Sequence, residues 1–242
     1  MNGDRYVWLA WASAFLIPWL GLFAALPRHR RTMAWASFGT MPFGLTEPLF
    51  VPEYWNPPSL FDLAHRTGFD IESLIFSFAI GGVGSVLYSA ITGRGLVPVG
   101  PGERRHRHHR YHLLALSAPA LAFPPLYLAP WNPIYPAIAA MALGGVATVI
   151  CRPDLLSKTW IGALLFLGYY ALFMLGLDWS APGYIARVWN LNALSGVVIH
   201  GVPIEELLFA LAFGMYWAGI YEHLTWRRPA NRQGAMAEAP CG

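Results

Sequence analysis

Seven apolar segments, each long enough to cross a bilayer as a helix, dominate the chain. They cover approximately residues 6–26, 33–51, 70–92, 111–129, 133–151, 159–179 and 202–224. A spanning helix needs about 20 predominantly apolar residues. Only 12% of the residues are charged, whereas soluble domains carry about 25%. The sequence therefore predicts an all-α integral membrane protein, a seven-transmembrane helix bundle in which residues 1–242 form a single membrane domain.

The distribution of basic residues predicts the orientation of the bundle. Of the 16 Lys and Arg residues, the predicted loops place Arg5, Arg66 and Arg187 on one side and all the others on the opposite side. The basic side of a membrane protein is normally cytoplasmic. We therefore expect a protein of the inner cell membrane with its N-terminus outside and its C-terminus cytoplasmic. The net charge of +3 follows from this topology, so it does not indicate a nucleic-acid partner.

The polar segments carry no strong metal or disulfide pattern. Cys151 and Cys241 are the two cysteines, too few for a disulfide framework and wrongly spaced for a zinc motif. The loop 101–110 holds His106, His108 and His109, and histidine-rich tracts can bind metals. Arginines between these histidines would repel a cation, however, so we expect a solvated basic loop near anionic lipid and no metal site. The tail 227–242 is expected to be disordered.

Two parts of the chain resemble each other. Each holds a Trp-Asn pair, a glutamate 16 or 17 residues later and a phenylalanine four residues beyond it: Trp55, Asn56, Glu72 and Phe76 in the first, and Trp189, Asn190, Glu205 and Phe209 in the second. We interpret this as an internal repeat, with repeat 1 at about 6–92, a linker loop and fourth helix at about 93–132, and repeat 2 at about 133–226. Parallel repeats place a site at their interface. The third and seventh helices would then bring Glu72 and Glu205 to one central cavity.

Acidic residues within these apolar segments are the leading candidates for function. Glu205 and Glu206 open an apolar run, where acids are costly and are usually retained for function. Two acids in a low dielectric can divide into a proton donor and a base. Adjacent helical residues point about 100° apart, so one alone can face Glu72, and the repeat alignment favours Glu205. The alternative is helix capping, in which both acids complement the positive end of their helix.

The residues around the acids allow both a binding and a structural interpretation. Trp55, Trp189, Phe76 and Phe209 could line a cavity whose ring faces stabilise a carbocation, or could belong to an interfacial aromatic belt. Asn56 and Asn190 could orient a carboxyl group. His200 could relay protons, or could lie at the membrane boundary without a chemical role. These residues are the predicted substrate-binding set.

Missing motifs narrow the chemistry further. The chain has no Asp-rich diphosphate motif and no credible dinucleotide-binding motif. Lys158 is the only lysine and precedes the sixth segment, so a retinal Schiff base on the last helix is excluded. Two possibilities remain: redox-neutral proton chemistry on an apolar substrate without a cofactor, or no chemistry at all.

The stretch Pro203–Phe209 and upstream Trp189, with the weaker copy from Trp55 to Phe76, resemble the flavin-independent integral-membrane lycopene cyclases. The resemblance implies a lycopene β-cyclase-like isomerase that protonates a linear isoprenoid from the bilayer and closes a β-ionone-type ring. It implies no redox cofactor, and assigns Glu205 and Glu206 jointly as acid and base, with Glu72 as a tuning or second catalytic group. The first half departs from the pattern, since Ser73 replaces the second acid and Asp70 the proline.

Several alternatives remain open from the sequence. A carotenoid end-group hydratase or isomerase would use the same cation. A proton-coupled transporter or lipid-binding membrane protein would use the acids without any chemistry on its ligand. The substrate, the number of rings and a homo-oligomeric state are not fixed by the residues.

Overall fold

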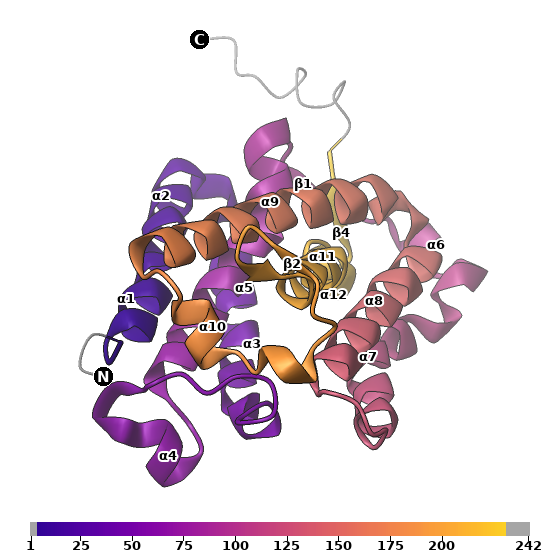
Figure 1. Cartoon of the computed structure of the whole chain (residues 1–242). Coiled ribbons are helices and arrows are strands. Elements are labelled where there is room, and N and C mark those ends of the chain that lie inside the picture. The colour runs from indigo at the N-terminus through magenta and orange to yellow at the C-terminus, as the bar shows by residue number, and fades with distance from the viewer. Residues whose placement is uncertain (1–3, 231–242) are drawn as a thin grey trace.

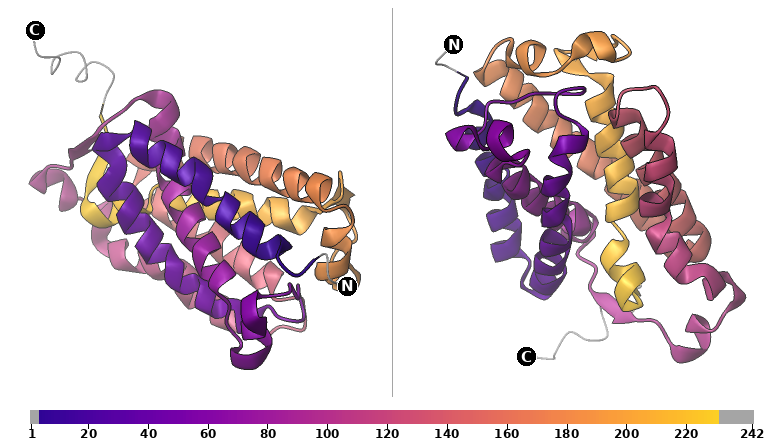
Figure 2. Two further views of the ribbon diagram at one scale, coloured as in Figure 1. Left: turned by 90° about the vertical axis from the view of Figure 1, so that its left-hand side faces the viewer. Right: turned by 90° about the horizontal axis from the view of Figure 1, so that it is seen from below.

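The structure, a computed structural model, describes residues 4–230, with the side chain of His108 excepted, and is almost entirely helical (Figure 1). Its α-helices are α1 (Val7–Ala14), α2 (Leu16–Ala25), α3 (Arg30–Thr40), α4 (Leu63–Thr67), α5 (Ile71–Thr92), α6 (Pro101–Arg104), α7 (His112–Tyr127), α8 (Ile134–Cys151), α9 (Leu156–Ser180), α10 (Tyr184–Val188), α11 (Ile204–Trp217) and α12 (Ile220–Thr225). The 3₁₀ segments are η1 (Pro27–His29), η2 (Met41–Leu49), η3 (Leu60–Asp62), η4 (Arg107–Tyr111), η5 (Pro153–Leu155) and η6 (Leu191–Ala193). The long helices lie side by side in one bundle (Figure 2).

Five helices in the described part of the chain are long and apolar enough to cross a membrane. They are Val7–Ala25, Ile71–Thr92, Ile134–Cys151, Pro153–Ser180 and Ile204–Thr225. The other two predicted spans, 33–51 and 111–129, are less regular than the sequence predicts. In the first, α3 ends at Thr40 and η2 continues, with Pro42 and Pro48 inside it. In the second, α7 has 16 residues and contains Pro119, Pro124 and Pro125, which lack the N–H that a regular helix needs.

The start of α5 is fixed by its cap. The carboxylate of Asp70 accepts a hydrogen bond from the Ser73 backbone N–H at 2.5 Å, the usual contact of an N-cap aspartate. The helix ends at Gly93, whose φ of 66° is the left-handed conformation that suits glycine after a helix. The cap places Glu72 and Ser73 in the first turn of α5, at the same end of the bundle as the start of α11.

Two central helices organise the packing. Helix α5 packs against α3 and η2, α11 packs against α8 and α9, and α5 also contacts α9. Glycines allow the closest approach. A Cβ on Gly81 would lie 1.7 Å from Thr40 Oγ1 and 2.9 Å from the Ala36 carbonyl oxygen, and a Cβ on Gly82 would lie 2.4 Å from Ser37 Oγ. The backbones of α3 and α5 therefore approach each other more closely than larger residues at these positions would allow.

The strands are short and lie at the ends of the bundle. Strand β1 (Leu96–Pro98) pairs antiparallel with β4 (Arg227–Pro229). The prediction of a disordered tail is therefore wrong for residues 227–229, because these residues pair with β1. Residues 231–242 of that tail, including Arg232 and Cys241, lie outside the described residues. A hairpin of β2 (Val198–Ile199) and β3 (Val202–Pro203) precedes α11.

Candidate functional site

A cavity of about 420 Å³ lies between the two central helices, within the usual range for small-molecule sites. Most of its lining is aromatic or aliphatic. The acidic residues in that lining are Glu47 of η2 and Glu206 of α11. An apolar cavity with two carboxyl groups can hold a hydrocarbon and place a proton donor and a proton acceptor beside it.

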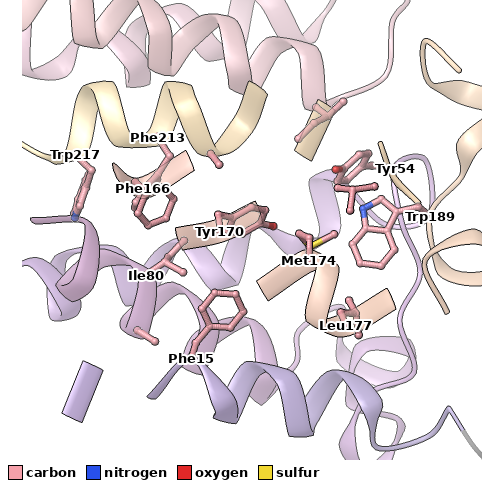
Figure 3. Packing of buried hydrophobic residues seen from close by; sticks show 14 of the residues in the cluster. Phe15, Tyr54, Ile80, Phe166, Tyr170, Met174, Leu177, Trp189, Phe213 and Trp217 are labelled. Carbon is pink, nitrogen blue, oxygen red and sulfur yellow. The ribbon is translucent and has the colours of Figure 1, made fainter. Parts of the chain in front are cut away.

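Aromatic rings form a continuous series along the cavity. Ring centroids lie 5.8 Å apart for Trp217 and Phe213, 6.0 Å for Tyr170 and Phe209, 5.5 Å for Phe76 and Trp8, and 5.3 Å for Trp55 and Trp189. Figure 3 shows Trp217, Phe213, Tyr170 and Trp189 following one another across the core. Ring faces carry partial negative charge and attract cations, so this lining suits a cationic intermediate as well as a neutral polyene.

Glu206 is buried at the cavity and accepts three hydrogen bonds. Its Oε1 accepts from the Tyr54 hydroxyl and from Trp189 Nε1, the latter at 2.6 Å. Its Oε2 accepts from the Tyr170 hydroxyl at 2.5 Å. These donors come from three different segments of the chain, which fix the carboxyl group and offset negative charge on it.

Glu47 occupies the other side of the lining and has fewer partners. Its Oε2 accepts a hydrogen bond from the Ser73 hydroxyl. Its Oε1 is buried and has no hydrogen-bond partner among the described residues. Ser73 stands at the position that the predicted repeat pairs with Glu206, and the first half brings its acid to the cavity from η2 instead of from α5.

Glu72 and Glu205, which the repeat alignment places at the centre, do not line the cavity. Glu72 is fully buried, and its Oε1 accepts from the Leu60 backbone N–H at 2.7 Å. Glu205 Oε1 accepts from the Ser195 backbone N–H and from the Tyr135 hydroxyl, each at 2.8 Å. Each of these carboxyl groups therefore holds the loop that precedes its own helix. The prediction that Glu72 and Glu205 share one central cavity is wrong.

Trp55 and Trp189 meet in an antiparallel β-bridge between the halves. The Asn56 backbone N–H donates to the Val188 carbonyl and the Asn190 backbone N–H donates to the Tyr54 carbonyl, both at 2.9 Å. Both tryptophans line the cavity, as do Phe76 and Phe209. Asn56 and Asn190 are exposed, and the Asn190 side chain donates to the Glu53 carbonyl at 3.1 Å, so neither orients a cavity carboxyl group.

His200 lies away from the cavity. It is exposed and forms the tight turn between β2 and β3 with Gly201, at φ values of 48° and 82°. Two successive positive φ values are typical of a type I′ hairpin turn. His200 therefore has a structural role in the hairpin turn and does not line the cavity.

Sequence reasoning missed Glu47 and Tyr170, which contribute polar groups to the cavity. Glu47 interrupts an apolar run between Pro42 and Pro48, the same feature that singled out Glu206. The second half has no acid at a position that corresponds to Glu47, so a comparison of the two halves does not reveal it. A tyrosine hydroxyl within an apolar helix gives no comparable pattern.

Exposed lining residues suggest that the cavity reaches the surface of the bundle between η2 and α7. Phe43 of η2 and Ala120 of α7 both line it, and both are exposed. This opening faces outward from the bundle between two apolar segments, where a bilayer would surround the protein.

Comparison with known families agrees with the resemblance seen in the sequence. Residues 132–224 match the family model described as lycopene cyclase. The match runs from just before α8 into α12, and includes Trp189 and Glu206 but not Glu47. Neither a curated protein nor a solved structure matches the chain. Through this second half, the chain resembles the lycopene cyclases.

Proposed function

We propose that this protein is an integral-membrane isoprenoid cyclase that converts a linear polyene such as lycopene to a product with a β-ionone-type ring. The observation that carries the proposal is the buried carboxyl group of Glu206 in an aromatic cavity. The match of this half to lycopene cyclases supports the same reading. The proposed chemistry is an isomerisation, in which no electrons are gained or lost.

The proposed architecture is a bundle of seven spans, built of two parallel repeats joined by α7. Helices α5 and α11 would be equivalent, as would Glu72 and Glu205. The reciprocal backbone bonds around Trp55 and Trp189 support this relation. The site would then form at the interface of the repeats.

The substrate would enter from the bilayer through the opening between η2 and α7. The cavity would take one end group, and the rest of the polyene would extend toward the lipid past Phe43 and Ala120. This path keeps the reacting end away from water, which would otherwise capture a carbocation.

The two cavity carboxyl groups divide the proton transfers. Burial in an apolar site favours the protonated form of a carboxyl group unless hydrogen-bond donors stabilise its charge. Of the two, Glu206 has the donors that stabilise negative charge, whereas Glu47 Oε1 has no hydrogen-bond partner in the described part of the chain, which suits a protonated acid. We assign Glu47 as the proton donor and Glu206 as the cation-stabilising base. This revises the joint assignment to Glu205 and Glu206, and leaves Glu72 and Glu205 to hold the loops.

The steps balance without a co-reactant. The Glu47 proton adds to the terminal double bond, and a tertiary carbocation forms. An internal double bond attacks this cation, closes a six-membered ring and leaves the charge on a ring carbon. Glu206 removes a neighbouring ring proton, so that a ring double bond forms. A proton then returns from Glu206 to Glu47 through solvent or side chains.

Expression in cells that accumulate lycopene, followed by pigment chromatography, tests this function. The wild-type chain should yield cyclised pigment. In deuterated water, each ring formed should carry solvent deuterium, because the added proton comes from a carboxyl group that exchanges with solvent. Unchanged lycopene in cells that express the folded protein would refute the proposed substrate. A proton-coupled transporter would leave its ligand free of label.

A further inference from the structure

Three histidines and a cysteine meet at the end of the bundle opposite Glu206. His109 lies in η4, His112 begins α7, Cys151 ends α8 and His223 lies in α12. Cys151 Sγ is 3.7 Å from His109 Nδ1 and 3.6 Å from His112 Nδ1, and His223 Nε2 is 3.0 Å from His112 Nδ1. The donor atoms of His109, His112 and Cys151 all lie within 4.8 Å of one another.

These separations suit the ligands of one tetrahedral metal ion. Zinc binds thiolate sulfur at about 2.3 Å and imidazole nitrogen at about 2.0–2.1 Å. Two ligands at the tetrahedral angle are then roughly 3.3–3.6 Å apart, by the geometry of those bonds. The sulfur–nitrogen distances match this range within about 0.2 Å, the tolerance for a metal site. The ligand atoms of His109 and His112 lie within 4.8 Å of each other and would draw together to about 3.4 Å around the ion. His223, whose Nε2 now lies 3.0 Å from His112 Nδ1, would have to turn toward the ion to supply the fourth ligand.

The surrounding packing holds these side chains in place. Cys151 and His223 are buried. The Trp226 ring stacks on His112 with centroids 4.1 Å apart, and meets His109 edge-on at 5.0 Å. Trp226 adopts a φ of 54°, a conformation that bulky residues rarely take. The chain around Trp226 therefore accepts an unfavourable backbone conformation while its ring covers the two histidines.

The neighbouring positive charges do not prevent a cation from binding. Arg152 follows Cys151, but its guanidinium donates to both oxygens of Asp154, at 2.8 and 2.6 Å. Lys158 forms a buried ion pair with Glu222. Arg107 and Arg110 are exposed, so solvent screens their charge. The repulsion expected from the sequence of this loop is therefore weak at the cluster itself.

A hydrogen-bonded histidine pair explains less of this arrangement. It would account for the contact of His112 with His223, but not for a buried thiol that lies 3.6 Å from the same His112 nitrogen and 3.7 Å from His109 Nδ1. Mixed nitrogen and sulfur donors in a closed, partly buried position are typical of structural zinc sites.

We propose that Cys151, His109, His112 and His223 form a structural Zn²⁺ site that joins α7, α8 and α12 at this end of the bundle. The site is separate from the cavity. Cys151 is ten residues along α8 from Met141, which lines the cavity, a rise of about 15 Å. The ion would fix the connecting helix to the second half of the protein without touching the substrate.

Co²⁺, a spectroscopic substitute for Zn²⁺, provides the test. The full chain, purified in detergent with an affinity tag that contains no histidine, should bind one equivalent of Co²⁺. The complex should show a thiolate-to-cobalt charge-transfer band and tetrahedral d–d absorption, and Zn²⁺ should abolish both. Cys151→Ser should lose the charge-transfer band. His112→Gln should weaken binding by at least roughly tenfold, the lower limit for loss of an outer-shell partner.

Two control variants make the test specific. Cys241→Ser removes the other thiol of the chain, and His65→Gln removes an exposed histidine of α4. Both should bind Co²⁺ like the wild type, and each variant should elute as the same folded particle. The proposal is overturned if folded wild-type protein binds no stoichiometric Co²⁺, or if the charge-transfer band persists in Cys151→Ser and disappears in Cys241→Ser.

Discussion

At the scale of single residues, two adjacent tyrosines separate a role at Glu206 from simple packing. The Tyr170 hydroxyl donates to Glu206 Oε2, whereas the Tyr169 hydroxyl has no hydrogen-bond partner among the described residues. We predict that Tyr170→Phe lowers the rate of cyclisation by about 10- to 100-fold, because a hydrogen bond to a charged group contributes about 1.5–3 kcal/mol. Tyr169→Phe should leave the rate nearly unchanged. Rates measured in isolated membranes with dispersed lycopene make the comparison, and equal effects of the two variants would contradict it.

The same scale shows where sequence reasoning about the acids succeeds and where it fails. An acid in an apolar run is visible in the sequence, and Glu206 does reach the cavity. Which of two adjacent glutamates faces inward depends on the rotation of α11, which packing against α8 and α9 sets. The proposed repeat pairs Glu205 with Glu72, and both carboxyl groups hold loops instead of lining the cavity. Glu47 has no counterpart in the second half, so only the three-dimensional arrangement brings it beside Ser73.

At the scale of elements, the close packing of α3 against α5 depends on a glycine, Gly81, at their contact. A Cβ at Gly81 would lie 1.7 Å from Thr40 Oγ1 and 2.9 Å from the Ala36 carbonyl oxygen. Gly81→Ala should therefore destabilise the bundle by about 1–3 kcal/mol, as overpacking usually does. Gly168→Ala is the matched control, because Gly168 is exposed on α9 with nothing within 4 Å of such a Cβ.

The readout for this pair is the midpoint of thermal unfolding in detergent. A lower midpoint for Gly81→Ala, together with an unchanged or higher one for Gly168→Ala, is the expected result. If Gly81→Ala unfolded at the same temperature as the wild type, the close packing of α3 against α5 described above would be contradicted.

The apolar segments themselves are readily predicted from the sequence, because length and composition determine what can span a bilayer. The internal form of two of them is not. Proline positions warn of irregularity, but the change from α3 to η2 at Met41 depends on packing against α5. The hairpin before α11 was also missed, although His200-Gly201 has a residue pair compatible with its turn.

At the scale of the whole molecule, the basic residues predict how the bundle sits in the membrane. Arg152 and Lys158 lie at the end of the bundle near β1 and β4, whereas Arg187 pairs with Asp4 at the other end. We predict that the end with β4 faces the cytoplasm. A C-terminal reporter that is active only outside the cytoplasm should give no signal, and an N-terminal one should be active. The reverse pattern would invert the bundle and place the cavity carboxyl groups in the cytoplasmic half.

The two segments that the sequence marks as similar lie against each other in the structure. The repeated Trp-Asn pairs predicted related positions, and Trp55 and Trp189 contact each other through their backbones and rings. The sequence shows the histidines of the loop but not the cluster, because Cys151 and His223 lie 39 and 111 residues beyond His112.

The most direct test of the account compares three isosteric changes, Glu206→Gln, Glu47→Gln and Glu205→Gln, in cells that accumulate lycopene. Glutamine cannot carry the proton at Glu206 or Glu47, so cyclisation should fall by about 10²–10⁴-fold, the usual contribution of general acid–base groups. Glu205→Gln should retain most activity, because an amide oxygen can still accept from Ser195 and Tyr135. Cyclised pigment at wild-type levels from folded Glu206→Gln, with loss of activity in Glu205→Gln, would contradict the assignment.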